Sequence, residues 1–299
     1  MKILLLGCGG QVGWELQRSL SPLGEVIACD FDSATDRRAD FSRPALVADL
    51  VGRVRADFIV NAAAYTAVDK AESEPDVARL VNASTVGVIA QCARKFGSTV
   101  VHYSTDYVFD GGGSAPRDET APTGPLSVYG ATKLEGEELI RSSGCRHVIL
   151  RTSWVYASRG DNFMKTMLRL AGEREQLSVI DDQIGAPTGA DLLADVTAHV
   201  VRQLGRGEGE EGTFHCVAGG ETSWFGFARY VIEWARADGQ SIKVAADRIR
   251  PIPTSDYPTP AMRPLNSRLS TEKLRGSYSL ILPQWQLGVE RALREIHGR

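Results

Sequence analysis

Tyr129 and Lys133 are the two residues whose types and spacing most directly suggest chemistry. They lie four residues apart at the predicted start of a helix, in the stretch SVYGATKLEGEELI (127–140), so their side chains project from one helix face and can converge. A free tyrosine has a pKa of about 10 and exchanges protons poorly near neutral pH. A nearby ammonium can lower this pKa by about 1–3. The pair therefore predicts a tuned proton donor for a carbonyl reduced by hydride.

A glycine cluster follows the first predicted strand. Gly7, Gly10 and Gly13 recur every three residues in LLLGCGGQVGWELQ (4–17), between that strand and an amphipathic helix. Such a turn lets the backbone approach a pyrophosphate, and the helix N-terminus offers unpaired amides to the phosphates. In this context the pattern predicts a dinucleotide site that also includes Gln11 and Val12.

Further cofactor contacts are expected along the first half of the chain. Asp30 ends the second predicted strand, where a carboxylate commonly binds the adenosine ribose. This favours NADH, because a carboxylate repels a 2′-phosphate, whereas Arg37 and Arg38 could accommodate NADPH instead. Asp40 and Phe41 are expected to flank the adenine after a short third strand. The small-residue turn 61–66 should let the cofactor lie against backbone at Ala63, Ala64 and Tyr65.

Short apolar runs alternate with helical patterns through the first half of the chain. Because strands that are apolar throughout are covered on both faces, this alternation predicts a doubly wound α/β fold with a parallel sheet, of Rossmann type. The expected strands are residues 2–6, 25–29, 57–61, 99–104 and 147–151, and the expected helices include 12–20, 78–96 and 129–143.

The pattern changes after about residue 150. Runs 177–181 and 213–217 still resemble sheet strands, but the Pro-rich stretch 249–269 predicts a smaller, irregular C-terminal substrate-binding lobe. Thr105 follows the expected strand 99–104, the fifth when the short strand before Asp40 is counted. It is placed there to bind the same carbonyl oxygen as Tyr129. The expected dinucleotide-binding domain is 1–150 with additions from about 163–180 and 192–235, and the lobe is about 151–162, 181–191 and 236–299.

Composition excludes several classes of protein. The net charge is −3 and the pI is near 6.0, without a basic run, which argues against a nucleic-acid partner. The 5 cysteines are scattered and predict free thiols rather than disulfides or a zinc site. The first apolar run is too short for a signal peptide or a membrane span. We expect a cytoplasmic protein that does not bind membranes.

The glycine turn, Thr105 and the Tyr129–Lys133 pair together resemble the extended short-chain dehydrogenase/reductase superfamily, which acts on nucleotide sugars. The resemblance implies that Lys133 also binds the nicotinamide ribose. Sugar dehydratases of the superfamily typically carry Thr-Asp-Glu at this strand end. This chain has Thr105-Asp106-Tyr107, so the resemblance argues against dehydration.

Further motifs narrow the resemblance to the dTDP-4-dehydrorhamnose reductase family, over essentially the whole chain. They include RTSWVY (151–156), DDQIGAPT (181–188) and RPLNSRL (263–269). The resemblance implies reduction of the C4 ketone of dTDP-4-dehydro-L-rhamnose, a dTDP-linked 4-keto-6-deoxy sugar, by NADPH or NADH. The implied sugar contacts are Thr105, Asp106 and Trp154; expected cleft residues are Asn162, Phe163 and Asn266, and Arg263 and Arg268 are candidates for the diphosphate.

The resemblance leaves two matters open. Some members of the family hold Mg²⁺ at a subunit contact, which here would involve Glu15, Asp191 and Glu295 of a homodimer; unrelated surface acids are the alternative. The function also has alternatives. One is a reductase or epimerase of another nucleotide-linked 4-keto sugar. The other is a non-catalytic regulatory subunit of the same family, which has little use for a tuned phenol.

Overall fold

The centre of the molecule is one six-stranded parallel sheet with the strand order β10-β5-β4-β3-β1-β2. The computed structural model describes residues 1–298. The five strands expected in the first half form within one residue of the predicted ends, and the run expected at 213–217 supplies the edge strand. The strands are β1 (Lys2–Leu6), β2 (Glu25–Cys29), β3 (Phe58–Asn61), β4 (Thr99–Thr105), β5 (Arg146–Thr152) and β10 (Gly212–His215).

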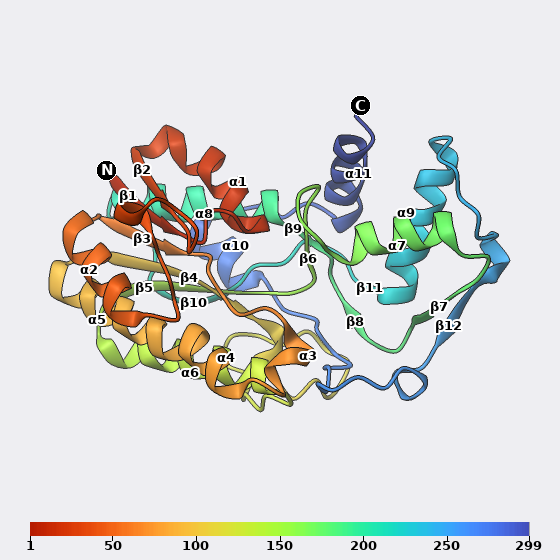
Figure 1. The fold of residues 1–299 in the computed structure, drawn as a ribbon, viewed down its shortest axis with the longest axis horizontal. Coiled ribbons are helices and arrows are strands. Elements are labelled where there is room, and N and C mark those ends of the chain that lie inside the picture. Colours follow the sequence, from red (N-terminus) through yellow and green to blue (C-terminus); the bar gives the residue numbers. More distant parts are fainter. Residues whose placement is uncertain (299) are drawn as a thin grey trace.

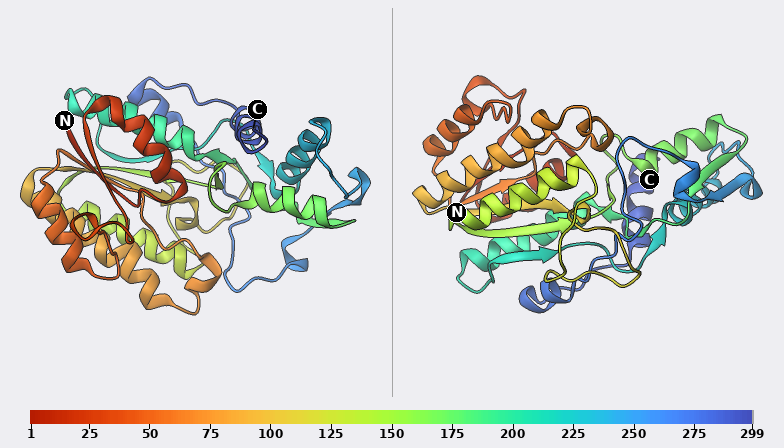
Figure 2. Two further views of the ribbon diagram at one scale, coloured as in Figure 1. Left: turned by 45° about the horizontal axis from the view of Figure 1, so that its top comes forward. Right: turned by 90° about the horizontal axis from the view of Figure 1, so that it is seen from below.

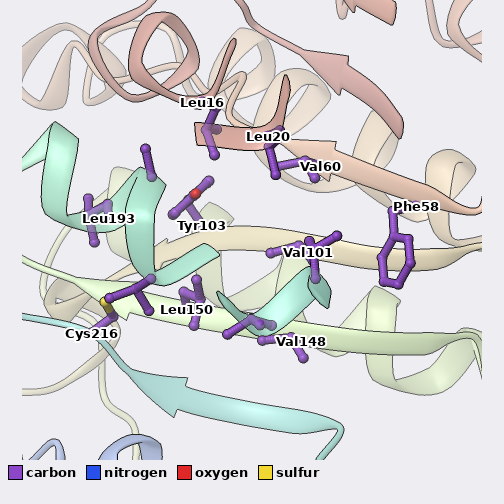
Figure 3. Packing of buried hydrophobic residues seen from close by; sticks show 14 of the residues in the cluster. Leu16, Leu20, Phe58, Val60, Val101, Tyr103, Val148, Leu150, Leu193 and Cys216 are labelled. Carbon is purple, nitrogen blue, oxygen red and sulfur yellow. The ribbon is translucent and has the colours of Figure 1, made fainter. Parts of the chain in front are cut away.

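Helices cover both faces of this sheet, which confirms the doubly wound fold (Figures 1 and 2). Alternate strand residues point to opposite faces, and each set packs on its own helix layer. One layer contains α1 (Gln11–Leu20), α8 (Ala190–Gly205) and α10 (Glu272–Tyr278); Figure 3 shows its packing, with Leu16 and Leu193 against Val101 and Leu150. The other layer contains α2 (Pro44–Val54), α5 (Thr85–Phe96) and α6 (Val128–Ser143).

The short strand expected before Asp40 does not form. Residues Thr35–Arg37 make a 3₁₀ turn, and only an isolated bridge joins Asp30 to Arg38. The chain thus reaches α2 without adding a strand beyond β2, because the segment 31–38 is polar and mostly exposed and offers no apolar face to bury. The order of strands reverses between β1 and β3, which is the position where doubly wound sheets bind ligands.

The helix expected over 78–96 is continuous but not uniform. It consists of α4 (Pro75–Arg79), a π-helical turn at Leu80–Ser84 and α5. The turn carries Asn82, whose side chain accepts from the Tyr65 amide at 2.9 Å and donates to the Tyr65 carbonyl at 3.2 Å. The π turn therefore anchors the loop after β3; the short helix α3 (Val68–Ala71) follows that loop.

A smaller lobe stands beside the carboxyl ends of the sheet strands (Figure 1). Its helices pack through two apolar clusters around Phe227 and Ile232. The strand expected at 177–181 forms but pairs with β12 and not with the central sheet. The elements are β6 (Val155–Tyr156), α7 (Phe163–Glu173), β7 (Leu177–Ile180), β8 (Ile184–Gly185), β9 (Thr188–Gly189), β11 (Thr222–Ser223), α9 (Trp224–Ala237), β12 (Ile249–Ile252) and α11 (Trp285–Ile296).

The domain boundaries expected from the sequence stay a prediction. In the described residues, α7, β7 and α9 belong to the clusters of the smaller lobe, whereas α8 and β10 complete the central sheet and its covering layer. Within residues 1–298, no helix is long and apolar enough to cross a membrane.

Candidate active site

A cleft of about 1040 Å³ runs along the carboxyl ends of β1, β3, β4 and β5 and reaches the smaller lobe. It is lined by the glycine loop at one end and by Trp154 and Trp224 at the other. Most of the predicted site residues line it: Gly7, Gly10, Gln11, Val12, Asp30, Asp40, Phe41, Ala63, Ala64, Thr105, Asp106, Tyr129, Lys133, Trp154 and Asn162.

The glycine loop has the geometry of a dinucleotide cradle. Gly7 adopts a φ of +82°, which side chains rarely tolerate. A Cβ on Gly13 would lie 1.9 Å from the Gly7 carbonyl oxygen, so only glycine lets α1 approach the loop this closely. Gly13 itself is buried behind the lining. The N-terminus of α1 has no side-chain cap, so its free amides fit a phosphate.

Asp30 lies at the end of β2, as expected, and bonds back to the loop. Its Oδ2 accepts from the Gly9 amide at 2.6 Å, and its Oδ1 accepts from Phe31 at 2.8 Å. Asp40 accepts two hydrogen bonds from Ser42, which hold the pKa of its carboxyl below the ordinary value. A carboxylate therefore stands at the rim where the adenosine ribose is expected.

Tyr65, like Gly13, is a predicted cofactor residue that lies outside the cleft lining. Its hydroxyl donates to Glu74 at 2.8 Å, away from the cleft, and its backbone is held by Asn82. The small side chains of Ala63 and Ala64 do face the cleft. The turn after β3 thus offers backbone and methyl groups, as predicted, but not the phenol.

Thr105, Asp106 and Tyr129 meet at the middle of the cleft. Thr105 and Tyr129 lie within reach of each other, and the Thr105 hydroxyl donates to Asp106 Oδ1 at 3.1 Å. Burial raises the pKa of Tyr129 to about 12, so the phenol is protonated at neutral pH. Burial also raises the pKa of Asp106 to about 6, although hydrogen bonds from Ser267 and Thr105 oppose this. The arrangement presents a protonated phenol beside a hydroxyl.

The expected pairing of Tyr129 with the Lys133 ammonium is absent from the described hydrogen bonds. Lys133 Nζ instead donates to the Tyr103 carbonyl at 2.6 Å and lies 3.2 Å from His102 Nε2. Burial lowers the pKa of Lys133 to about 8. The prediction that Lys133 lowers the pKa of Tyr129 is therefore wrong for the unliganded protein, because hydrogen-bond partners on β4 hold the amine instead.

Trp154 forms the far wall of the cleft in an unusual conformation. Its φ of 51° is one of three positive values among the described non-glycine residues, and such strain concentrates at functional sites. Its indole stacks on Trp224 with ring centroids 3.7 Å apart, and the Trp224 Nε1 donates to Gln183 at 3.1 Å. Trp224 thus covers one face of Trp154, and Gly185 also lies against the indole, so the part that lines the cleft remains for a ligand.

Asn162 joins the two ends of the cleft. It caps α7 by accepting from the Lys165 amide at 3.1 Å, and its Nδ2 donates to Gln11 Oε1 at 2.9 Å. A predicted substrate residue therefore touches a predicted cofactor residue directly. Phe163, the next residue, does not line the cleft; it packs on Trp224 with ring centroids 4.5 Å apart and supports the aromatic wall.

The residues expected to bind diphosphate lie outside the cleft lining and have partners already. Arg263 forms a two-pronged pair with Asp69, at 3.0 and 2.8 Å, and Arg268 pairs with Glu221 at 2.6 Å. Asn266 is buried and donates to backbone carbonyls of the 111–125 loop, which gives it a structural contact. A role for Arg263 in binding diphosphate stays a prediction and requires exchange of the Asp69 partner.

The three acids considered for Mg²⁺ do not come together. Glu15 pairs with Arg18, while Asp191 and Glu295 each pair with Arg291. Among residues 1–298, no three His, Cys, Asp or Glu side chains form a group suited to a metal ion. The donor set of one chain does not fit a metal.

Sequence reasoning missed several polar or aromatic residues that line the cleft, among them Thr152 and Trp224. Thr152, at the end of β5, has a buried hydroxyl without a hydrogen-bond partner in the described part of the chain, and Asp106 Oδ2 is likewise unsatisfied. Trp224 begins α9 and belongs to no motif near the others in the chain. Thr152 could have been predicted as a cleft residue, because it lies within the RTSWVY motif directly before Ser153 and Trp154. No sequence motif identified Trp224 as a cleft residue.

Residues 1–297 match the family described as "RmlD substrate binding domain". A dTDP-4-dehydrorhamnose reductase from Shigella flexneri is 56% identical over 296 residues, covering 99% of this chain and 98% of the relative. The chain belongs to the dTDP-4-dehydrorhamnose reductase family. The Escherichia coli K12 reductase of this name is also 56% identical, again over 99% of this chain and 98% of its own.

Solved structures of the family have the same fold. A dTDP-4-dehydrorhamnose reductase from Clostridium acetobutylicum superposes with a TM-score of 0.89 at 33% identity, covering 99% of this chain and 100% of its own. One from Bacillus anthracis, in complex with NADP, superposes with a TM-score of 0.88 at 34% identity, covering 98% and 99%. The Rossmann-type fold and the superfamily resemblance inferred from the motifs are confirmed.

Proposed function

We propose that this protein reduces the C4 ketone of dTDP-4-dehydro-L-rhamnose to give dTDP-L-rhamnose, with a reduced nicotinamide dinucleotide as cofactor. One observation carries the proposal. The glycine cradle and the Thr105–Tyr129 pair line a single cleft in a chain that is 56% identical to reductases of this name.

The chain's own residues would divide the work by position. Bound reduced nicotinamide supplies the hydride. Tyr129, protonated and close to Thr105, would give its proton to the developing alkoxide, and Thr105 would hold the same oxygen in place. Asp106 Oδ2 and Thr152 Oγ1, buried and unsatisfied, would accept from or donate to sugar hydroxyls. The exposed part of Trp154 would pack against the apolar face of a deoxyhexose.

The cofactor is NADPH or NADH, and the rim carries features for each. Asp30 disfavours a 2′-phosphate, whereas Arg38, whose backbone bridges to Asp30, could supply a cation for one. Association into a homodimer is also proposed, and sedimentation of the purified protein tests it. The protein is proposed to work in the cytoplasm, because its scattered cysteines suggest free thiols in a reducing compartment.

The test is cofactor oxidation with dTDP-4-dehydro-L-rhamnose made in situ, in the wild type and in Tyr129→Phe. We expect formation of dTDP-L-rhamnose, and a loss of about 10²–10⁴-fold in kcat in the variant, as for removal of a general acid. Tyr107→Phe is the matched comparison. It removes the same atom from a neighbouring cleft tyrosine, whose ring centroid lies 5.5 Å from that of Tyr129, and should cost far less.

Other outcomes would redirect the assignment. Turnover of a different nucleotide-linked 4-keto sugar, with the same dependence on Tyr129, would indicate another reductase or epimerase. Tight binding of the dinucleotide without turnover of any keto sugar, together with coelution with a larger partner, would support the regulatory subunit. Equal activity of wild type and Tyr129→Phe would exclude Tyr129 as the proton donor.

A further inference from the structure

Lys133 ends a buried chain of hydrogen bonds that starts at the backbone of the cleft. The Ala63 amide donates to Asn61 Oδ1 at 3.1 Å, Asn61 Nδ2 lies 3.0 Å from His102 Nδ1, and His102 Nε2 lies 3.2 Å from Lys133 Nζ. The amine also contacts the Tyr103 carbonyl at 2.6 Å. Asn61, His102 and Lys133 are at most 2% exposed, so bulk water supplies no alternative partner.

The direction of each hydrogen bond in this chain is fixed from its start. The Ala63 amide can only donate, so the oxygen of Asn61 faces it and the NH₂ group faces His102. His102 Nδ1 must then accept, and a neutral imidazole that accepts at Nδ1 carries its proton on Nε2. That N–H points at Lys133. An ammonium has three donors and no acceptor, so it would meet the imidazole donor to donor, whereas a neutral amine accepts this hydrogen bond.

The charges around Lys133 agree with a neutral amine. No salt bridge to Lys133 is formed within the described residues, and the nearest acid on its helix, Glu137, is already paired with Arg141 and Arg151. Burial lowers the pKa of Lys133 to about 8, opposed by Glu137. Burial holds the pKa of His102 well below its ordinary value, so the imidazole stays neutral. The elements packed around Lys133 carry these titratable or charged groups: His102 on β4, Asp106 in the turn after β4, Tyr129 and Glu137 on α6, and Arg151 on β5.

We propose that Asn61 and His102 are positioning residues that favour the neutral amine of Lys133 in the unliganded protein, so that binding of the dinucleotide is coupled to proton uptake by Lys133, which approaches one proton at alkaline pH. The identity of the ligand rests on the proposed function. The proton comes from solvent and adds to the lone pair of Nζ that faced the imidazole. His102 neither gains nor loses a proton. The ammonium then donates to a ribose hydroxyl.

The first test needs no cofactor. Two-bond ¹⁵N–¹H correlation spectra of the uniformly labelled free protein at pH 9 report which imidazole nitrogen carries the proton, and His102→Gln assigns the signal among the 5 histidines. We expect the Nε2–H form in the wild type. Asn61→Asp is isosteric, but its second oxygen accepts from Nδ1–H, so this variant should show the Nδ1–H form. An Nδ1–H tautomer in the wild type would overturn the proposal.

The second test measures the proton. Calorimetric titration of NADPH at several pH values, each in two buffers of different ionisation enthalpy, gives the number of protons taken up. The pKa of Lys133 is about 8 in the free protein, and the ordinary value of about 10.4 is expected in the complex. Uptake should then rise from about 0.1 proton at pH 7 to about 0.9 at pH 9.

Variants separate this coupling from the enzyme's turnover. In Asn61→Asp the imidazole can accept from an ammonium, so Lys133 is already charged and uptake at pH 9 should fall below about 0.3 proton. His147→Gln changes a half-buried histidine that is hydrogen-bonded to the Cys145 carbonyl and takes no part in the hydrogen-bonded chain that ends at Lys133. This variant should leave proton uptake unchanged. Binding without uptake at pH 9 in the wild type would refute the coupling even if the reductase assay succeeds. Failure of the reductase assay would leave both of these measurements decisive.

Discussion

Glu137→Gln tests whether one buried charge holds together the elements beneath the cleft. Glu137, on α6, is fully buried. Its Oε1 accepts from Ser104 at 2.5 Å and from Arg151 Nε at 2.9 Å, and its Oε2 accepts from Arg151 Nη2 at 2.7 Å and from Arg141 at 3.0 Å. The carboxylate thus ties α6 to β4, one residue before Thr105, and to β5.

The magnitude follows from the loss of charge without loss of volume. Glutamine leaves the Arg151 side chain, 4% exposed, without an anion, and breaking a buried pair in this way costs about 3–5 kcal/mol. An unfolding entropy of about 2.1 cal/mol/K per residue amounts to about 0.6 kcal/mol/K for 299 residues. Scanning calorimetry should therefore show a fall in Tm of about 5–8 °C.

Glu135→Gln is the matched control on the same helix. Its partner is Arg79 and both side chains are open to solvent, 41% and 59% exposed, so the loss should be below about 1 kcal/mol, or less than about 2 °C. Burial raises the pKa of Glu137, but its hydrogen bonds and the Arg151 charge outweigh this and lower it. The Glu137–Arg151 pair thus stabilises the fold above a pH of about 4.3. The Tm difference between wild type and Glu137→Gln should shrink as the pH falls through the pKa that Glu137 has in the folded protein. Equal losses of Tm in the two variants would refute the reasoning.

Two further predictions concern the cofactor cradle. Gly13→Ala would place a methyl group 1.9 Å from a loop carbonyl, so NADPH affinity measured by fluorescence titration should fall at least about tenfold; Gly276→Ala, with open space around its Cβ, should leave it unchanged. Asp30→Asn should raise the preference for NADPH over NADH, measured as the ratio of kcat/KM values, by about tenfold, or about 1.4 kcal/mol, because a carboxylate no longer faces the 2′-phosphate. Asp32→Asn, the same change in the same loop, should change this ratio far less, and equal effects would show that only general charge matters.

The predictions of the sheet strands and of the glycine turn were confirmed, because burial and close backbone contact fix both the residue pattern and the structure. The strands are apolar on both faces since helices cover both, and Gly13 is required by a backbone contact that any side chain would break. The prediction of a short strand before Asp40 was wrong, because this segment has no apolar surface to bury in the sheet. Its segment is polar, and no sequence motif says that the sheet ends at β2.

Predictions about long side chains were less secure. Spacing along a helix places the Cα of Lys133 one turn from Tyr129, but the amine lies where its hydrogen-bond partners are, at the Tyr103 carbonyl and His102 on β4. Those partners are some 30 residues distant in sequence. Arg263 similarly forms its ion pair with Asp69, which lies 194 residues away in the sequence. Sequence spacing does not encode such partners, because they arise only when separate elements pack.

The unliganded cleft keeps several polar groups at a cost that a ligand would remove. Asp106 Oδ2 and Thr152 Oγ1 are buried without partners, and each such group destabilises a fold by about 1–3 kcal/mol. Trp154 adds a left-handed backbone conformation that costs a similar amount. The rigid ends of β4 and β5 hold these groups in place, so a sugar that satisfies them gains their hydrogen bonds without having to order them. This is the physical reason to expect specificity for a hydroxylated ring at the middle of the cleft, beside Tyr129, and not at the glycine loop, where the backbone amides would recognise only phosphate.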